Sequence, residues 1–183
     1  MSLSQTSEIT DARRVLETEA AAIKLAAERL DANFVRAVEI LDVPHGKIVV
    51  SGLGKSGHVG RKIAATFCST GSPAVFMHAG EAVHGDLGVH QSGNPTVFLS
   101  NSGSTSELLA LVPILRCRGS SLVGILGNLD GVLAQKMDVA LDASVCREAD
   151  PLGIVPTASF VVTAALGDAL ASSLMHKRGF SEE

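Results

Sequence analysis

Short apolar runs alternate with helical stretches along most of this 183-residue chain, and this alternation limits the fold more than any other feature. Almost every residue of each run is apolar, as is typical of strands buried on both faces of a sheet. Strands that alternate with helices form parallel sheets covered by helices. We therefore predict an α/β fold, a three-layer αβα sandwich around a five-stranded parallel sheet. The predicted strands are Lys47 to Ser51, Ala74 to His78, Thr96 to Ser100, Ser121 to Leu126 and Val139 to Leu141.

The stretches between and after these strands have helical character. Ligands of open parallel sheets bind at the carboxyl ends of the strands, so the loops that follow the strands are the places to search for a site. The predicted helices are Gly57 to Thr70, Ser104 to Arg118, roughly Gly131 to Lys136, and Thr157 to Arg178.

A narrow apolar stripe precedes the first strand. Its members recur at alternating four- and three-residue steps, which predicts one long helix or a helix pair. Such a face packs either on the core or on another subunit, and the sequence leaves both open. We divide the chain into a helical segment, 1–37, and a sheet-containing domain, 38–183. The stripe consists of Leu16, Ala20, Ile23, Ala27, Leu30 and Phe34.

The composition narrows the classes of ligand. A net charge of -4 offers no basic surface for nucleic acid. Trp and Tyr are absent and Phe numbers six, so aromatic stacking platforms are scarce and polar groups are expected to recognise the ligand.

The cysteines and the hydropathy indicate a cytoplasmic protein. Three cysteines without a C-x-x-C spacing argue against a disulfide framework and a structural zinc site. The polar N-terminus has no secretory signal, and the apolar stretch from Ala158 to Met175 is interrupted by Asp168. We therefore expect a buried helix there and no membrane association.

A hydroxyl-rich turn, Ser100-Asn-Ser-Gly-Ser-Thr-Ser-Glu107, follows the third predicted strand. A turn of this kind presents hydroxyls and unpaired backbone N–H groups at a helix N-terminus, where the helix dipole also favours negative charge. Phosphate is the expected guest. The alternative is that Ser102 or Ser104 only caps the helix, with Glu107 closing a capping box from Ser104.

A glycine-rich loop, Gly52-Leu-Gly-Lys-Ser-Gly57, follows the first strand and matches G-x-G-x-x-G. A dinucleotide site would also need an acidic residue at the end of the second strand, where the chain has Met77-His78. A nucleotide-binding motif of the GxxxxGK type would need a glycine where this chain has Val49. Lys55, at the end of a central strand, can instead meet a phosphate or a developing oxyanion.

Titratable residues gather in two further loops. His78 and His84 lie beside Glu81 and Asp86 in a glycine-bounded loop, which favours proton transfer, although loop histidines are often only exposed. Their six-residue separation is not that of a compact H-x-x-x-H pair, so metal binding is the less favoured alternative. Glu148 and Asp150 follow the fifth strand. Both can be solvated loop acids, but Glu148 lies where a catalytic carboxylate could reach a bound sugar.

Four segments together resemble the sugar isomerase (SIS) domain, and more narrowly the D-arabinose 5-phosphate isomerase family of the Kdo, lipopolysaccharide and capsule pathways. The likeness covers roughly Val38 to Phe180 and implies a flavodoxin-like sheet. The segments are Ser51 to His58, His78 to Asp86, Ser100 to Glu107, and Glu148 to Gly153.

The resemblance implies roles for individual residues. Positions matching catalytic residues are Lys55, His84, Glu107 and Glu148, and positions matching the phosphate loop are Ser100, Asn101, Ser102 and Thr105. Further substrate-binding positions are Ser56, Gly71, Ser72 and His78, with His84 also matching a substrate contact.

The resemblance also implies a homotetramer with active sites at subunit interfaces. This sequence departs from the family pattern at two places. Ser104 stands where relatives commonly carry an acid. Relatives also continue into an S-H-P-G-G segment and usually a pair of CBS domains, whereas this sequence ends at Glu183.

The chemistry implied is an aldose-ketose isomerisation between D-ribulose 5-phosphate and D-arabinose 5-phosphate through a cis-enediol. It needs a base, an acid and charge stabilisation, but no redox cofactor or metal. We assign Glu148 as base and His84 as acid or ring-opening group. Lys55 stabilises the oxyanion, and Glu107 orients Lys55 or the sugar. The alternatives are a 6-phospho-3-hexuloisomerase and a non-catalytic sugar-phosphate sensor.

Overall fold

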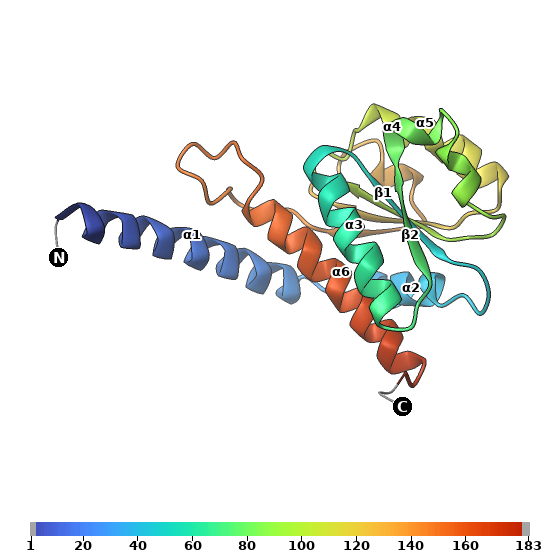
Figure 1. Cartoon of the computed structure of the whole chain (residues 1–183), viewed down its shortest axis with the longest axis horizontal. Coiled ribbons are helices and arrows are strands. Elements are labelled where there is room, and N and C mark those ends of the chain that lie inside the picture. The colour runs from blue at the N-terminus through green and yellow to red at the C-terminus, as the bar shows by residue number, and fades with distance from the viewer. Residues whose placement is uncertain (1–2, 181–183) are drawn as a thin grey trace.

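The sheet has the five predicted strands, all parallel, in the order β2-β1-β3-β4-β5. The structure is a computed structural model that describes residues 3–180 (Figure 1). Two strands have the predicted bounds, and the other three differ by one residue at one or both ends. The strands are β1 (Ile48–Gly52), β2 (Ala74–His78), β3 (Thr96–Ser100), β4 (Leu122–Leu126) and β5 (Val139–Asp142).

Helices cover both faces of the sheet and confirm the predicted three-layer αβα sandwich. Because side chains alternate along a strand, Val50 and Leu99 enter one core while Val49 and Phe98 enter the other. The first core is closed by α2 (Ala32–Leu41), α3 (Gly54–Ser69) and α6 (Ala158–Lys177). The second is closed by α4 (Ala79–Ala82), α5 (Ser106–Cys117) and the 3-10 helix η2 (Ala134–Lys136), with η1 (Asp86–Val89) packed beside it.

The helix predictions are confirmed with one exception. The helix expected over Gly131 to Lys136 is wrong, since only the three residues of η2 are helical there. The helix expected from Gly57 begins earlier, at Gly54, because the glycine-rich turn that ends β1 itself forms the first turn of α3.

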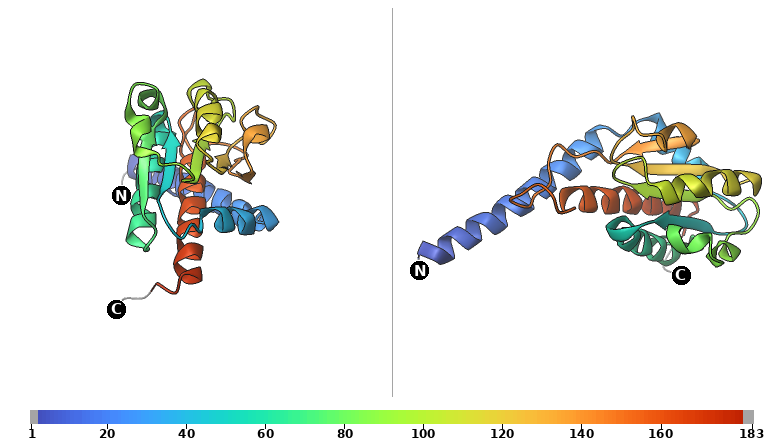
Figure 2. Two further views of the ribbon diagram at one scale, coloured as in Figure 1. Left: turned by 90° about the vertical axis from the view of Figure 1, so that its right-hand side faces the viewer. Right: turned by 90° about the horizontal axis from the view of Figure 1, so that it is seen from above.

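The N-terminal region is a helix pair, and the larger helix extends away from the sandwich. α1 (Leu3–Glu28) projects beyond the loop before α6 (Figures 1 and 2). Its buried residues are Ala22 and Ala26, whereas Leu16 of the predicted stripe is 66% exposed and Ile23 is 39% exposed. Most of the predicted stripe is therefore uncovered in the single chain.

The second helix of the pair belongs to the core. Asp31 caps α2 by accepting a hydrogen bond from the backbone N–H of Asn33. Ala37, Val38 and Leu41 are buried in the first core. The boundary placed between residues 37 and 38 falls inside α2, and the last three residues of the predicted domain, 181–183, lie outside the described part of the chain.

Helix α6 is long and apolar enough to pass a length-and-composition test for a membrane span. In the structure, its residues Val162, Leu170 and Leu174 are buried in the first core. The helix lies against both α3 and α1 (Figure 1). This placement agrees with the buried helix predicted for Ala158 to Met175.

Candidate active site

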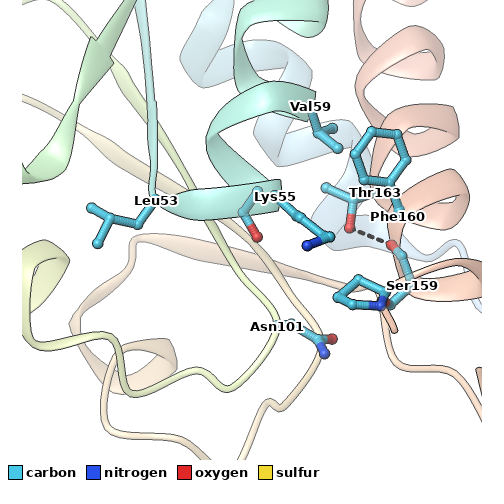
Figure 3. Close-up of a pocket in the computed structure, with 9 residues that line it drawn as sticks. Leu53, Lys55, Val59, Asn101, Ser159, Phe160 and Thr163 are labelled. Carbon is cyan, nitrogen blue, oxygen red and sulfur yellow. Dashed lines mark hydrogen bonds between the residues drawn. The ribbon is translucent and has the colours of Figure 1, made fainter. Parts of the chain in front are cut away.

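A cavity of about 240 Å³ opens at the carboxyl ends of β1 and β3, between α3 and α6 (Figure 3). It lies where a parallel sheet of this kind binds ligands. Three of its lining residues were predicted from the sequence: Lys55, Ser56 and Asn101. The others are Leu53, Val59, Pro156, Ser159, Phe160 and Thr163.

The hydroxyl-rich turn forms a hydrogen-bonded loop at the end of β3. The Ser100 and Thr105 hydroxyls lie 2.8 Å apart, and the backbone N–H of Gly103 donates to Ser100 Oγ at 3.1 Å. Ser102 Oγ accepts from the backbone N–H of Ser104 at 3.3 Å. These bonds draw the hydroxyls together over the start of α5. We call residues 100–105 the phosphate loop.

The phosphate loop is fitted closely against the loop after β4. Gly103 has a φ of +66°, and a Cβ at this position would collide with the backbone carbonyl of Asn128. A Cβ on Gly127 would collide with Asn101 in the same way. Glycine is therefore required at both positions for the two loops to approach each other.

The start of α5 contradicts the simple capping alternative. The N-cap is Thr105, and its side chain makes no capping hydrogen bond. Glu107 does not close a capping box with Ser104 but accepts a hydrogen bond from Ser106 Oγ at 2.9 Å. The first-turn N–H groups of α5 are thus left without a side-chain cap and can donate to an anion.

A second uncapped N-terminus, that of α3, lies beside the cavity. Its N-cap, Leu53, has no polar side chain, and Lys55 and Ser56 occupy its first turn. Lys55 is exposed, points toward the cavity in Figure 3, and forms no salt bridge within the described residues. A cation and two helix dipoles therefore favour negative charge at this edge of the sheet.

Glu148 is hydrogen-bonded to Ser159, a residue that lines the cavity, and caps α6. Its Oε2 accepts from the backbone N–H groups of Thr157 at 2.9 Å and Ser159 at 3.1 Å, and from Thr157 Oγ1 at 3.2 Å. Its Oε1 accepts from the Ser159 hydroxyl. Burial raises the pKa of the Glu148 carboxyl, but these hydrogen bonds outweigh it and hold the pKa below its ordinary value. Glu148 is therefore ionised and only weakly basic.

His78, at the carboxyl end of β2, interacts electrostatically with Glu107, in the first turn of α5. The pKa of Glu107 is lowered, first by the backbone N–H at its own position in the helix, then by the Ser106 hydroxyl, with a contribution from the charge of His78. The His78 ring packs edge-on to Phe76, with centroids 6.4 Å apart, and its Nδ1 is buried without a hydrogen-bond partner in the described chain.

The remaining predicted residues are spread over the molecule. His84 is exposed in the turn between α4 and η1, at the same edge of the sheet as the cavity. Gly71 and Ser72 precede β2 and lie at the opposite edge, where Ser72 Oγ accepts from Arg178 at 2.9 Å. Within one chain the structure therefore separates Gly71 and Ser72 from the other predicted site residues.

Residues 3–180 contain no group of three or more His, Cys, Asp or Glu side chains placed to hold a metal ion.

The cavity wall that α6 contributes was not predicted from the sequence. Ser159, Phe160 and Thr163 line the cavity from the first two turns of α6. The signal was present, because Pro156-Thr157 predicts a helix start. Helix starts at the carboxyl edge of a sheet face the ligand, but the sequence could not show that this helix crosses back to β1.

The comparisons with known proteins agree with this geometry. The SIS domain family matches residues 41–173. Arabinose 5-phosphate isomerase KdsD of Pseudomonas aeruginosa is 46% identical over 175 residues, which cover 96% of this chain and 54% of that protein. Arabinose 5-phosphate isomerase GutQ of Salmonella typhimurium is 48% identical over 156 residues, covering 85% of this chain and 49% of that protein. The chain thus spans about half the length of these curated relatives.

A solved structure matches over the whole chain. It is the Escherichia coli CFT073 protein c3406 in complex with arabinose 5-phosphate, with a TM-score of 0.91 and 35% identity, covering 100% of this chain and 96% of that one. The parallel sheet, the loop at the end of β3 and the match over residues 41–173 lead to one conclusion. This chain belongs to the SIS domain family.

Proposed function

We propose that this chain is an aldose-ketose isomerase that interconverts D-ribulose 5-phosphate and D-arabinose 5-phosphate through a cis-enediol intermediate. The observation that carries the proposal is the arrangement at one sheet edge of the phosphate loop, two uncapped helix N-termini and Lys55. The names of the KdsD and GutQ relatives and the arabinose 5-phosphate complex of the neighbouring structure support the choice of sugar.

The phosphate group binds in the phosphate loop. The Ser100, Ser102 and Thr105 hydroxyls and the first N–H groups of α5 donate to its oxygens. Anchoring the phosphate holds the other end of a five-carbon sugar over the cavity, so binding energy far from the reacting carbons fixes their position. Asn101 and Ser56 contact the sugar between the two ends.

The base in this proposal is Glu148. Its Oε1 carries one hydrogen bond, from Ser159, and keeps a lone pair for a proton. In the aldose-to-ketose direction the base removes the C2 proton while an acid protonates O1. The enediol then accepts a proton at C1 and loses the proton of O2. Because Glu148 is weakly basic, the negative charge that develops on oxygen must be stabilised strongly. Lys55 supplies the positive charge that stabilises it.

His84 and Glu107 complete the proposed machinery. His84 serves as the acid at the sugar oxygen or opens the cyclic form, and Glu107, paired electrostatically with His78, orients the sugar hydroxyls. The proposed site leaves out Gly71 and Ser72, which the fold places at the opposite edge.

The cellular setting follows from the same proposal. We place the enzyme in the cytoplasm, in a pathway to Kdo-containing lipopolysaccharide or capsule. Cys68, Cys117 and Cys146 are all unpaired and exposed, a state that a reducing compartment preserves. We also propose a homotetramer with active sites at subunit interfaces, which the uncovered face of α1 supports.

The direct test is turnover. The chain is incubated with D-ribulose 5-phosphate in D2O, and NMR follows the appearance of the aldose and of deuterium at C2. We expect both, and we expect Glu148→Gln to abolish deuterium incorporation while binding of the sugar phosphate persists. Unchanged exchange in that variant would remove Glu148 from the base role.

Two other outcomes would replace the proposal. Binding of the sugar phosphate without turnover would identify a sensor. Turnover of 3-hexulose 6-phosphate in place of the pentose would identify a hexuloisomerase.

A further inference from the structure

Arg118, at the end of α5 remote from the phosphate loop, is bonded to one short segment of chain. Its Nη1 donates to the carbonyls of Leu87 and His90, both at 3.0 Å. Its own carbonyl accepts from the Gly93 N–H at 2.8 Å and from Ser92 Oγ at 3.1 Å. One residue thus binds the 87–93 segment at four points that are far from it in sequence.

That segment begins three residues after His84. The chain leaves the carboxyl end of β2, passes His84 in the turn after α4, and descends through η1 to the start of β3. His84 and the two residues after it are exposed. Gly85 has a φ of +133° and nothing within 4 Å of where its Cβ would lie, so the turn itself is loosely packed. Beyond the hydrogen bonds within the turn, the first side-chain anchor after His84 is therefore Arg118, at the Leu87 carbonyl.

A buried polar network fixes the lower end of the same segment. His90 is 3% exposed, and its Nε2 donates to the Asn94 carbonyl at 3.0 Å because a carbonyl can only accept. The same carbonyl accepts from Ser120 Oγ at 2.7 Å, and Ser120 Oγ lies 2.9 Å from Thr96 Oγ1. Arg118 thus clamps a segment whose far end is rigid, so losing the clamp frees mainly the end that bears His84.

Helix α5 connects this clamp to the ligand. Its N-terminus receives the phosphate loop and Glu107, and its C-terminal cap is Arg118. A single rigid element therefore sets both the position of the phosphate and the height of the His84 turn above the sheet. Removing the guanidinium leaves the Leu87 and His90 carbonyls without this donor, and the turn can then shift relative to the phosphate loop.

We propose that Arg118 is a positioning residue that holds His84 in register with the phosphate loop. The proposal rests on the isomerase function above, in which His84 contacts the sugar. It assigns no contact between Arg118 and the substrate, and it predicts that Arg118 acts on turnover through His84 alone.

The test measures kcat and KM for D-ribulose 5-phosphate in the whole chain and in three variants. We expect Arg118→Ala to lower kcat about tenfold with KM within about twofold, since a small misplacement of a catalytic group is costly while phosphate binding is untouched. Arg118→Lys, which can still donate to one carbonyl, should recover part of the loss. The matched control is Arg116→Ala, because Arg116 lies two residues away on α5 and its guanidinium bonds to Asp138 and to the Lys136 and Ser120 carbonyls, not to the 87–93 segment.

A double-mutant cycle with His84→Gln decides whether the effect passes through His84. We expect Arg118→Ala to cost nothing further in the His84→Gln background. An equal loss of kcat with and without His84 would overturn the proposal, as would a rise in KM without a change in kcat.

A spectroscopic measurement keeps the two proposals separate. The imidazole NMR signals of His84 should shift in Arg118→Ala and stay in place in Arg116→Ala, whether or not the chain turns over sugar. A wild-type chain without turnover would contradict the isomerase function. Unchanged His84 signals in Arg118→Ala would contradict the positioning role.

Discussion

At the scale of single residues, the candidate site depends on charged and polar groups that have no partner within the described chain. Within the described chain Lys55 has no carboxylate partner, whereas Lys62, on the same helix, pairs with Asp168. Thr105 occupies an N-cap position without capping. A free cation and free N–H groups cost little at the surface and are available to an anionic ligand.

We predict that Lys55→Met reduces kcat by about a hundredfold or more, because in the proposed mechanism it removes the positive charge that stabilises the enediolate. The melting temperature should stay within about 2 °C of wild type, because the lysine makes no ion pair in the described chain. Lys62→Met is the control and should retain turnover while losing some stability. Full activity in Lys55→Met would contradict the role given to the lysine.

Gly103→Ala tests the fit of the phosphate loop. A methyl group there meets the Asn128 carbonyl and also strains a backbone with a φ of +66°, so we expect sugar-phosphate affinity to fall by at least about tenfold, with a lower melting temperature. Gly93→Ala is the matched control, because its φ is +80° and nothing lies within 4 Å. Calorimetric titration and thermal unfolding measure both effects. Equal affinities in the two variants would show that the loop tolerates the change.

At the scale of elements, the N-termini of α3, α5 and α6 face the carboxyl edge of the sheet, and the chain itself neutralises that of α6. Glu148 accepts the backbone N–H groups of Thr157, the N-cap of α6, and of Ser159 in its first turn, while α3 and α5 have no side-chain cap. The ligand site is therefore defined by what is left uncapped as much as by which residues line the cavity.

We predict that Glu148→Gln lowers the free energy of unfolding by about 1 to 2 kcal/mol at pH 7, because a glutamine cannot accept all four hydrogen bonds. The folded-state pKa of Glu148 is depressed, so its stabilisation is complete above the ordinary value of 4.5 and is lost as the pH falls through the lower folded value. The difference between variant and wild type should therefore shrink below about pH 4.5.

Denaturant titrations at several pH values measure this difference. Glu39→Gln is the control, because Glu39 is exposed on α2 and its side chain has no hydrogen bond or salt bridge within the described chain, so this change should leave the stability nearly the same at every pH. A difference that stays constant down to about pH 3 would contradict the capping role of Glu148.

At the scale of the whole molecule, α1 is the part that the single chain does not explain. Ile9, Leu16 and Ile23 of α1 are exposed at seven-residue intervals, and the helix extends beyond the sandwich (Figure 2). A repeat of seven is the spacing of a helix seam that packs on another helix. The face predicted to meet the core or a neighbouring subunit thus remains available for a neighbour.

We predict that Leu16→Glu lowers the oligomeric state, because a charge would be buried in the seam between copies. Sedimentation velocity of wild type and variant over a range of concentrations measures it. Lys24→Glu, an exposed change on the same helix, is the control and should leave the assembly intact. An unchanged mass for Leu16→Glu would show that assembly uses another surface.

The α/β layering and the strands could be predicted from the sequence, because apolar runs of about five residues between helical stretches have few other ways to bury themselves. Residues 100–105 and Lys55 could likewise be identified as candidates, because their chemistry lies in contiguous motifs at strand ends. A contiguous motif keeps its local geometry in any compatible fold, so it can be recognised before the fold is known.

Which distant residues meet could not be predicted from the sequence and follows from the packing of the fold. It brought Ser159 and Phe160 to the cavity, gave Glu148 its four hydrogen bonds, moved Gly71 and Ser72 to the opposite edge, and clamped the His84 segment with Arg118. These placements depend on how α3, α5 and α6 return across the sheet. That path is set by packing between residues far apart in sequence, for which a single sequence carries no local signal.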